Sequence, residues 1–220
     1  MARCPFAEWV PSPNHSKRSR SVLGTLQHST VSNWSSALAE LTRDDADPVS
    51  AHFLIGLDGR LAQLVDTDRV AWHAISANSQ WLGVEHVDDG RHWDSVRTPE
   101  QYAMSARLNR WLADMYDYPV NASTIERHRT FVATACPSGL DVERIIIETQ
   151  GGNMADYIER AEFEGYVADV RTTFEAVKKA LHEHKHGPAT FTLALPRKAR
   201  KVPTAKRATR AQVRAGHGRK

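Results

Sequence analysis

Runs of apolar residues along the chain predict three strand regions. Residues 21–28 and residues 82–87 are each short and mostly apolar, which is typical of buried strands. Between them, the apolar runs 52–57 and 60–65 flank an Asp-Gly pair at residues 58–59. Because Asp-Gly favours a two-residue type I′ turn, these two runs predict a β-hairpin.

Apolar residues at helical spacing predict two shorter helices. Residues 33–41 place Trp34, Leu38 and Leu41 on one face of a helix. A second short helix is expected over residues 138–146, which are rich in leucine and isoleucine.

A longer helix is predicted from a start motif at residues 98–101. Thr98 is a good N-cap, Pro99 suits the first helical position, and Gln101 fits the partner position of a capping box. The helix is expected to run to about Tyr116, with four side chains facing inward: Tyr102, Leu108, Leu112 and Met115. Since strands and helices interleave, the fold class predicted is α/β, with a central mixed β-sheet flanked by helices.

The pattern changes beyond residue 150. Gly151 and Gly152 predict a hinge, and residues 166–184 predict a separate helix because their apolar positions follow a heptad-like 3-4-3-4 spacing. This helix either packs on the preceding domain or serves as a targeting or self-association module. The histidines at its end fit a solvated helix end or a second metal site: His182, His184 and His186.

Charge is distributed unevenly along the chain. Residues 188–220 hold 10 Lys and Arg and no Asp or Glu, whereas the rest holds 19 basic and 26 acidic residues, a net charge of −7. The last segment also contains three prolines and little apolar periodicity. These features predict a disordered basic tail on an acidic body.

Length and cysteine content indicate the kind of protein. A chain of 220 residues suits one domain with an appendage, predicted as a domain over 1–150, a helical extension over 151–187 and the tail over 188–220. No apolar run approaches the ~20 residues of a membrane span. The N-terminus has no apolar core of a secretory signal, and Cys4 and Cys136 do not make a disulfide framework. Synthesis in a reducing cytoplasm is therefore expected.

Two histidines and one cysteine form a candidate metal site. His28 ends the first apolar run, and His128 precedes Cys136 by eight residues. Three such ligands can hold Zn²⁺ with the fourth position open, and a water there would become a nucleophile near neutral pH. The chain has 11 His and 2 Cys, so this spacing alone also fits a buried cysteine and two solvated histidines.

The residues around these three positions resemble the zinc-dependent N-acetylmuramoyl-L-alanine amidases, the superfamily of phage amidase lysozymes and peptidoglycan recognition proteins. The resemblance covers roughly residues 20–150 and rests on five stretches in the family's order: 21–30, 49–60, 71–74, 82–86 and 126–137. It implies a mixed sheet with a zinc cleft at one edge, and His28, His128 and Cys136 as the Zn²⁺ ligands. Cysteine as the third ligand resembles the phage and recognition proteins, whereas cytoplasmic recycling amidases have Asp there.

Glu85 and Thr134 are the candidate catalytic residues. Glu85 lies within an apolar strand, where a carboxylate is costly without a purpose, and the resemblance places it where related bacterial amidases carry a catalytic Glu. The alternative is an ordinary edge-strand carboxylate. The Tyr that phage lysozymes use is replaced here by Ala51. Thr134 occupies a position of Lys or Thr in relatives, and either hydrogen-bonds an oxyanion or caps its own loop.

Three further residues are expected near the substrate. His73 resembles the family's histidine on the substrate wall, Trp72 is expected to pack beneath it, and His52 is expected on a strand near the cleft.

The resemblance implies a phage-type endolysin that cleaves the amide between N-acetylmuramic acid and L-alanine in bacterial peptidoglycan. Such enzymes are made in the host cytoplasm and reach the cell wall through a holin lesion, which agrees with the missing signal sequence. Two alternatives stay open. A recognition module without catalysis is one, although the intact ligand set argues against it. The basic tail also suggests nucleic-acid binding, but the acidic body offers no recognition element, and the tail could equally bind anionic wall polymers.

Overall fold

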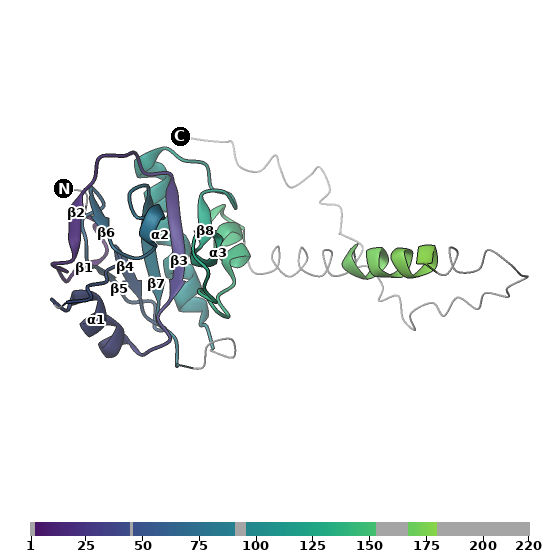
Figure 1. The fold of residues 1–220 in the computed structure, drawn as a ribbon, viewed down its shortest axis with the longest axis horizontal. Helices are drawn as coiled ribbons and strands as arrows, with labels where there is room; N and C mark the ends of the chain where they lie inside the picture. Colours follow the sequence, from purple (N-terminus) through teal and green to yellow (C-terminus); the bar gives the residue numbers. More distant parts are fainter. Residues whose placement is uncertain (1–2, 45, 91–95, 153–166, 180–220) are drawn as a thin grey trace, which may run out of the picture. The chain divides into compact units, whose positions relative to one another are not determined.

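The computed structural model describes residues 3–44, 46–90, 96–152 and 167–179 (Figure 1). Contacts between Cα atoms divide the chain into two units, residues 1–167 and residues 168–220. The first unit contains the sheet, its flanking helices and every predicted site residue.

A six-stranded mixed sheet forms the centre of the first unit. Its strand order is β1-β5-β4-β7-β3-β8, and β3 pairs in parallel with both β7 and β8, while β4 and β5 are antiparallel. The strands are β1 (Glu8–Trp9), β5 (Leu61–Gln63), β4 (Phe53–Ile55), β7 (Trp81–His86), β3 (Gly24–Ser29) and β8 (Ile125–Arg127). A separate pair joins β2 (His15–Lys17) to β6 (Arg69–Ala71). The predicted α/β class with a mixed sheet is confirmed.

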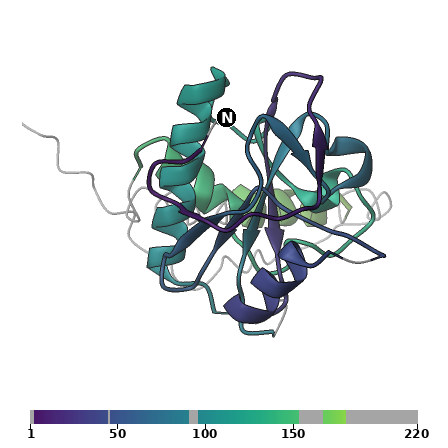
Figure 2. The same cartoon turned by 90° about the vertical axis from the view of Figure 1, so that its left-hand side faces the viewer.

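Alternate residues of β4 show how helices cover the two faces of the sheet. Phe53 and Ile55 belong to a core cluster with Leu108 and Leu112 of helix α2 (Pro99–Tyr116). Leu54, which points to the other face because side chains alternate along a strand, clusters instead with residues of helix α1 (Trp34–Thr42). Figure 2 shows α2 running along one side of the sheet. The short helix α1 covers only part of the opposite face, and the candidate site lies beside it.

The predicted helix starts at Asn33 and Thr98 are confirmed. Asn33 caps α1 through Ser36, and Thr98 caps α2 by accepting from the Gln101 amide. The predicted capping box is wrong, because the buried Gln101 side chain donates to backbone carbonyls of β4 and of the residue after β7 instead. Met115 is 39% exposed, so its predicted inward position is also wrong.

The turn of the β4–β5 hairpin differs from the predicted type I′ turn. The hairpin register pairs Ile55 with Leu61, so the loop is longer than two residues. The Gly59 amide donates to the Gly56 carbonyl, and Gly59 alone of the Asp-Gly pair has a positive φ, of 78°. A type I′ turn needs positive φ at both residues. The Asp58 side chain instead accepts from the Arg60 backbone amide, which is the local bond of an Asx turn.

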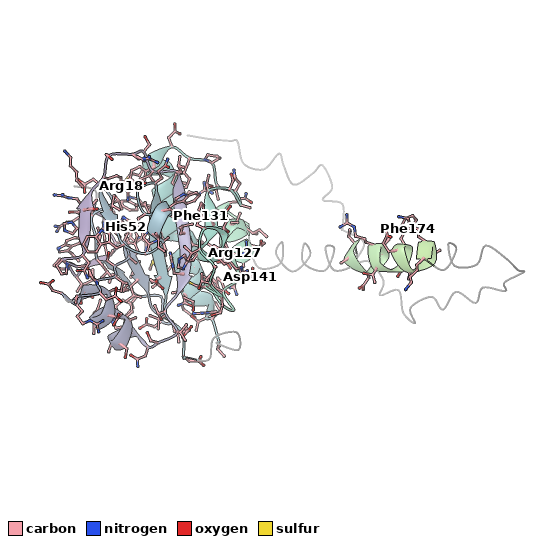
Figure 3. The ribbon with its side chains drawn as sticks, in the orientation of Figure 1. Arg18, His52, Arg127, Phe131, Asp141 and Phe174 are labelled. Carbon is pink, nitrogen blue, oxygen red and sulfur yellow. The ribbon has the colours of Figure 1, made fainter. Side chains whose placement is uncertain are left out.

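The helix predicted from residue 138 begins later, as α3 (Val142–Thr149). Gly139 has a φ of 69°, which is outside the helical region, and Asp141 is the N-cap that accepts from Arg144. Residues 167–179, nearly all of which belong to the second unit, are helical. Three of their apolar side chains are exposed: Val167, Val170 and Phe174, the last labelled in Figure 3.

The predictions for the basic tail and for the three histidines at 182–186 lie outside the described residues. Among the helices of the described ranges, none combines the length and the apolar character that crossing a membrane requires.

Candidate active site and metal centre

Strand β3 presents His28 on the face of the sheet that α1 leaves partly uncovered. His28 is only 2% exposed, and its register partner on β7 is Glu85, whose other neighbour is Leu54 of β4. Because these three residues are direct cross-strand neighbours, their side chains lie on one face. A cleft of about 600 Å³ opens there, and His28 and Glu85 line it.

Hydrogen bonds assign the tautomer of His28. His73 Nε2 lies 3.3 Å from the carbonyl oxygen of Trp81, which can only accept, so this nitrogen carries the proton. His73 Nδ1 is then bare and accepts from His28 Nε2 at 3.0 Å. Burial lowers the pKa of both rings, that of His73 to about 3, so both are neutral. The lone pair of His28 Nδ1 therefore faces the cleft, as a metal ligand requires.

His128 and Cys136 reach the site from the loop that follows β8. The two residues stand at the ends of a bent segment that the Arg129 amide closes by donating to the Cys136 carbonyl. The Cys136 thiol sulfur accepts from the Ser29 amide at 3.3 Å and lies 3.8 Å from His28 Nδ1. The ligand atoms of His28, His128 and Cys136 all lie within 4.8 Å of one another. The structure thus brings the three predicted ligands together.

This donor set suits zinc. Tetrahedral Zn²⁺ with ordinary bond lengths separates a sulfur from a nitrogen by roughly 3.6 Å, close to the distance between Cys136 Sγ and His28 Nδ1. Neutral imidazoles offer lone pairs without first losing a proton. Burial and the charge of Glu85 raise the pKa of the Cys136 thiol to about 12 in the metal-free protein, so binding of a metal must displace this proton.

Glu85 lies beside the ligands with one oxygen unsatisfied. Its Oε1 is 3.7 Å from His28 Nδ1, and its buried Oε2 has no hydrogen-bond partner within the described ranges. Desolvation, with a smaller contribution from the charge of Asp88, raises the pKa of this carboxyl to about 8. A carboxyl with a pKa near neutrality can both take up and release a proton, which general acid–base catalysis requires.

Thr134 and Trp72 line the same cleft. The Thr134 hydroxyl oxygen accepts from the Cys136 amide at 3.2 Å, so it caps its loop, while its hydrogen is still available to a substrate oxygen. The backbone of Trp72 is paired with Ser50 in both directions, and this pairing fixes the wall of the cleft.

The structure does not bring His52 to the cleft surface. His52 is fully buried behind His73, with ring centroids 5.8 Å apart, and its Nδ1 accepts from the Gly83 amide. Arg18 Nη2 lies 3.1 Å from His52 Nε2, and Arg18 Nη1 donates to the Ser79 carbonyl. Both Arg18 and His52 are labelled in Figure 3. His52 therefore supports the ring that lines the cleft, in place of the predicted contact with substrate.

A buried ion pair next to the candidate ligands was missed by the sequence analysis. Arg97 and Asp88 form an ion pair at 3.3 Å whose side chains are 3% and 0% exposed. Neither residue stands in a recognisable motif, since Asp88 follows β7 in an acidic turn and Arg97 precedes a helix cap. Only their burial distinguishes them from surface charges.

Comparison with known proteins agrees with this geometry. Residues 18–139, more than half of the chain, match the N-acetylmuramoyl-L-alanine amidase family, and the chain belongs to this family. It is 34% identical over 108 residues to N-acetylmuramoyl-L-alanine amidase A of Achromobacter lyticus, a match that covers 47% of this chain and 59% of that protein. The chain thus spans less than two thirds of this relative's length.

Solved structures share the fold. An AmpD derivative superposes with a TM-score of 0.55 at 22% identity, covering 65% of this chain and 94% of that one. The N-acetylmuramoyl-L-alanine amidase LysC from Clostridium intestinale gives 0.52 at 19% identity, covering 68% and 100%. The Drosophila peptidoglycan recognition protein SA gives 0.50 at 18% identity, covering 61% and 87%.

Proposed function

We propose that this protein hydrolyses the amide bond between N-acetylmuramic acid and L-alanine in bacterial peptidoglycan, with Zn²⁺ as its cofactor. The observation that carries the proposal is the convergence of His28, His128 and Cys136 with the unsatisfied carboxylate of Glu85 in one cleft. Membership of the amidase family supports the choice of substrate and bond.

Zn²⁺ held by these ligands would supply Lewis acidity toward the amide carbonyl and would make a water acidic near neutral pH. Glu85 has the position and the raised pKa to take the proton of the attacking water. The same carboxyl then delivers this proton to the leaving nitrogen of L-alanine. The Thr134 hydroxyl donates to the oxygen that becomes negative as the tetrahedral intermediate forms.

His73 and Trp72 line the cleft, and we assign both to the part of its wall that faces the substrate. The orientation of the His73 ring is fixed, because one of its nitrogens is hydrogen-bonded to His28 and the other to the Trp81 carbonyl. We assign it a contact with the glycan or peptide through the exposed part of its ring.

We further propose that the enzyme acts as an endolysin, made in the host cytoplasm of a bacteriophage infection and released to the cell wall through a holin lesion. Cysteine as the third ligand supports this assignment over a recycling amidase. Attraction of the basic tail to anionic wall polymers would add affinity for the wall at low salt, since exposed charges are screened over ~10 Å at 0.1 M.

The test is digestion of purified peptidoglycan with and without a chelator. Amidase activity releases new L-alanine N-termini, is lost with the chelator and returns with Zn²⁺. New reducing sugar ends would instead show a glycosidase. Binding to peptidoglycan without cleavage, in the zinc-loaded protein, would favour a recognition module.

A matched pair of variants isolates the metal site. Cys136→Ser is expected to lose zinc and activity together. Cys4→Ala changes the other cysteine, which is buried in the core cluster beside α2, and is expected to retain both.

A further inference from the structure

Arg97 contacts the segments that carry three residues of the candidate site, namely His28, Glu85 and Cys136. Its Nη2 donates to the Ser29 hydroxyl at 2.7 Å, and Ser29 directly follows His28 on β3. Its Nη1 donates to the Val87 carbonyl at 2.8 Å, two residues after Glu85. One guanidinium therefore links the end of β3 to the end of β7.

The same guanidinium reaches the loop of the third ligand. Arg97 Nη2 donates to the Ser138 carbonyl at 3.2 Å, and Ser138 lies two residues after Cys136. Ser138 is itself buried, at 2% exposure, so water does not compete for this carbonyl. The bond from the Ser29 amide to the Cys136 sulfur links the ligand loop to β3 directly, and the Arg97 bond links the loop to β3 through the Ser29 hydroxyl.

The charge of Arg97 is balanced inside the protein by one carboxylate. Asp88 Oδ2 accepts from Arg97 Nη2 and also from the Ser29 hydroxyl at 2.7 Å. Its other oxygen accepts from the Gly90 amide. A buried ion pair is expensive to desolvate and gives little net stability compared with apolar residues of the same size. Its presence here is explained better by orientation than by stability.

We propose that Arg97 is a positioning residue that holds the segments of His28, Glu85 and Cys136 in the arrangement that binds Zn²⁺. The inference rests on the proposed zinc site and adds the group that organises it. Arg97 is suited to this task because its planar guanidinium offers five donors in fixed directions, whereas a lysine ammonium at the same place can satisfy Asp88 but cannot span Val87, Ser29 and Ser138 together.

The central experiment is the zinc affinity of Arg97→Lys, measured by competition with a chromophoric chelator. This variant keeps the positive charge beside Asp88. Outer partners of metal ligands are typically worth 10–100-fold in metal affinity, and we expect a loss in this range. Arg144→Lys is the control, because Arg144 pairs with Glu148 in a partly buried ion pair on α3, and within the described ranges neither residue's neighbours include a residue of the candidate metal site.

A second readout needs no metal and no activity. In the chelator-treated protein, the rate of alkylation of the Cys136 thiol is followed by mass spectrometry. If Arg97 holds the ligand loop, Arg97→Lys raises this rate several-fold while the buried Cys4 stays protected. Ser29→Ala removes only the hydroxyl shared by Arg97 and Asp88, and serves as the test if Arg97→Lys does not fold. Ser29→Ala is expected to raise the alkylation rate of Cys136 by less than Arg97→Lys does.

The outcomes separate the inference from the proposed function. If the wild-type protein binds no Zn²⁺, the metal site itself is wrong. If the wild type binds Zn²⁺ and folded Arg97→Lys matches it in both affinity and thiol alkylation, the metal site stands and the role of Arg97 is refuted. Equal losses in Arg97→Lys and Arg144→Lys would also refute it, because the effect would then come from general destabilisation.

Discussion

The candidate metal site has two halves that are built differently. On the strand side, His28 is 2% exposed and lies on β3 between its two parallel partners, β7 and β8. Its Nε2 is held by His73, which leaves Nδ1 free for a metal. On the loop side, His128 and Cys136 are only partly buried and come from a segment between β8 and α3 that has little regular structure. The sheet thus positions one half of the site, whereas a few hydrogen bonds hold the other half, which the proposed metal would complete.

This difference between the strand side and the loop side predicts how substitutions on each side should affect the site. Changes on the strand side alter the chemistry without moving the backbone, because the ladder of β3 and β7 fixes it. Changes on the loop side alter the geometry and therefore the affinity for the metal. The predictions below separate these two effects, beginning with the largest.

Glu85→Gln is expected to lower turnover by about 10²–10⁴-fold while zinc content stays the same, because the amide keeps the shape of the side chain but cannot carry the proton. Activity on peptidoglycan and bound zinc are measured in parallel. Glu126→Gln, a carboxylate on β8 that accepts from Thr130, is the control and should keep its activity. Near-native turnover in Glu85→Gln would exclude Glu85 as the base.

Zinc affinity is expected to rise with pH by about tenfold per unit between pH 6 and 8, because the Cys136 thiol, with its pKa raised to about 12, must lose a proton on binding. Cys136→Asp offers a ligand that is already ionised in this range, so its affinity should lose this contribution to the slope. Titrations with a competing chelator at several pH values provide the measurement. An equal slope in both proteins would show that the thiol is not a ligand.

Metal removal should affect the two halves unequally. In hydrogen exchange, amides of residues 128–138 are expected to lose protection on chelation by tenfold or more, whereas amides of β3 and β7 keep theirs, because the sheet is stable without the ion. Equal loss in both regions would mean that the metal holds the whole fold together.

The contribution of Glu85 to the stability of the metal-free protein should fall as the pH rises from about 4.5 to about 8. The Glu85 carboxyl has a pKa raised from 4.5 to about 8 in the folded state, so the folded protein holds this proton over a range in which the unfolded chain has lost it. The contribution of Glu85 to stability is fully present below pH 4.5 and is lost progressively as the pH rises to about 8, where the folded protein releases the proton. Thermal melts of wild type and Glu85→Gln in chelator should therefore diverge at high pH, with the variant more stable, and converge near pH 4.5.

The smallest effect is expected at the rim of the cleft. Ile75 is 80% exposed and has a φ of 49°, a left-handed conformation that is costly for a β-branched residue. Ile75→Asn should raise the unfolding free energy by about 1 kcal/mol, because Asn tolerates this conformation. Leu23→Asn, at an exposed position without a positive φ, should not stabilise the protein in the same melts.

The sequence was informative where local patterns decide the structure. The cap at Thr98, the apolar spacing over residues 33–41 and the apolar runs of β3 and β7 predicted those elements, because capping and burial act over a few residues. The strands β1, β2, β6 and β8 were missed because two or three residues carry no recognisable period, and their pairing is decided by distant partners.

The features of the candidate site also fall into those that local sequence patterns predicted and those that they did not. The three ligands and Glu85 could be proposed because each stands in a motif of the family. The tautomer of His28, the burial of His52 and the Arg97–Asp88 pair could not, since each depends on contacts between segments far apart in the chain. The type I′ turn failed for a related reason, as an Asp-Gly pair fits more than one turn and the strand register decides between them.

The separation of the ligands along the chain has a consequence for synthesis. His28 and Cys136 are 108 residues apart, so at about 5–20 residues per second the ribosome makes the last ligand roughly 5–20 s after the first. Strand β3 cannot pair with its parallel partners until β7 and β8 have also been synthesised. A nascent chain that ends before residue 136 would hold all the strands of the sheet but only two of the three ligands. The proposed zinc site would therefore be incomplete until Cys136 has been added, shortly after the last strand of the sheet, β8.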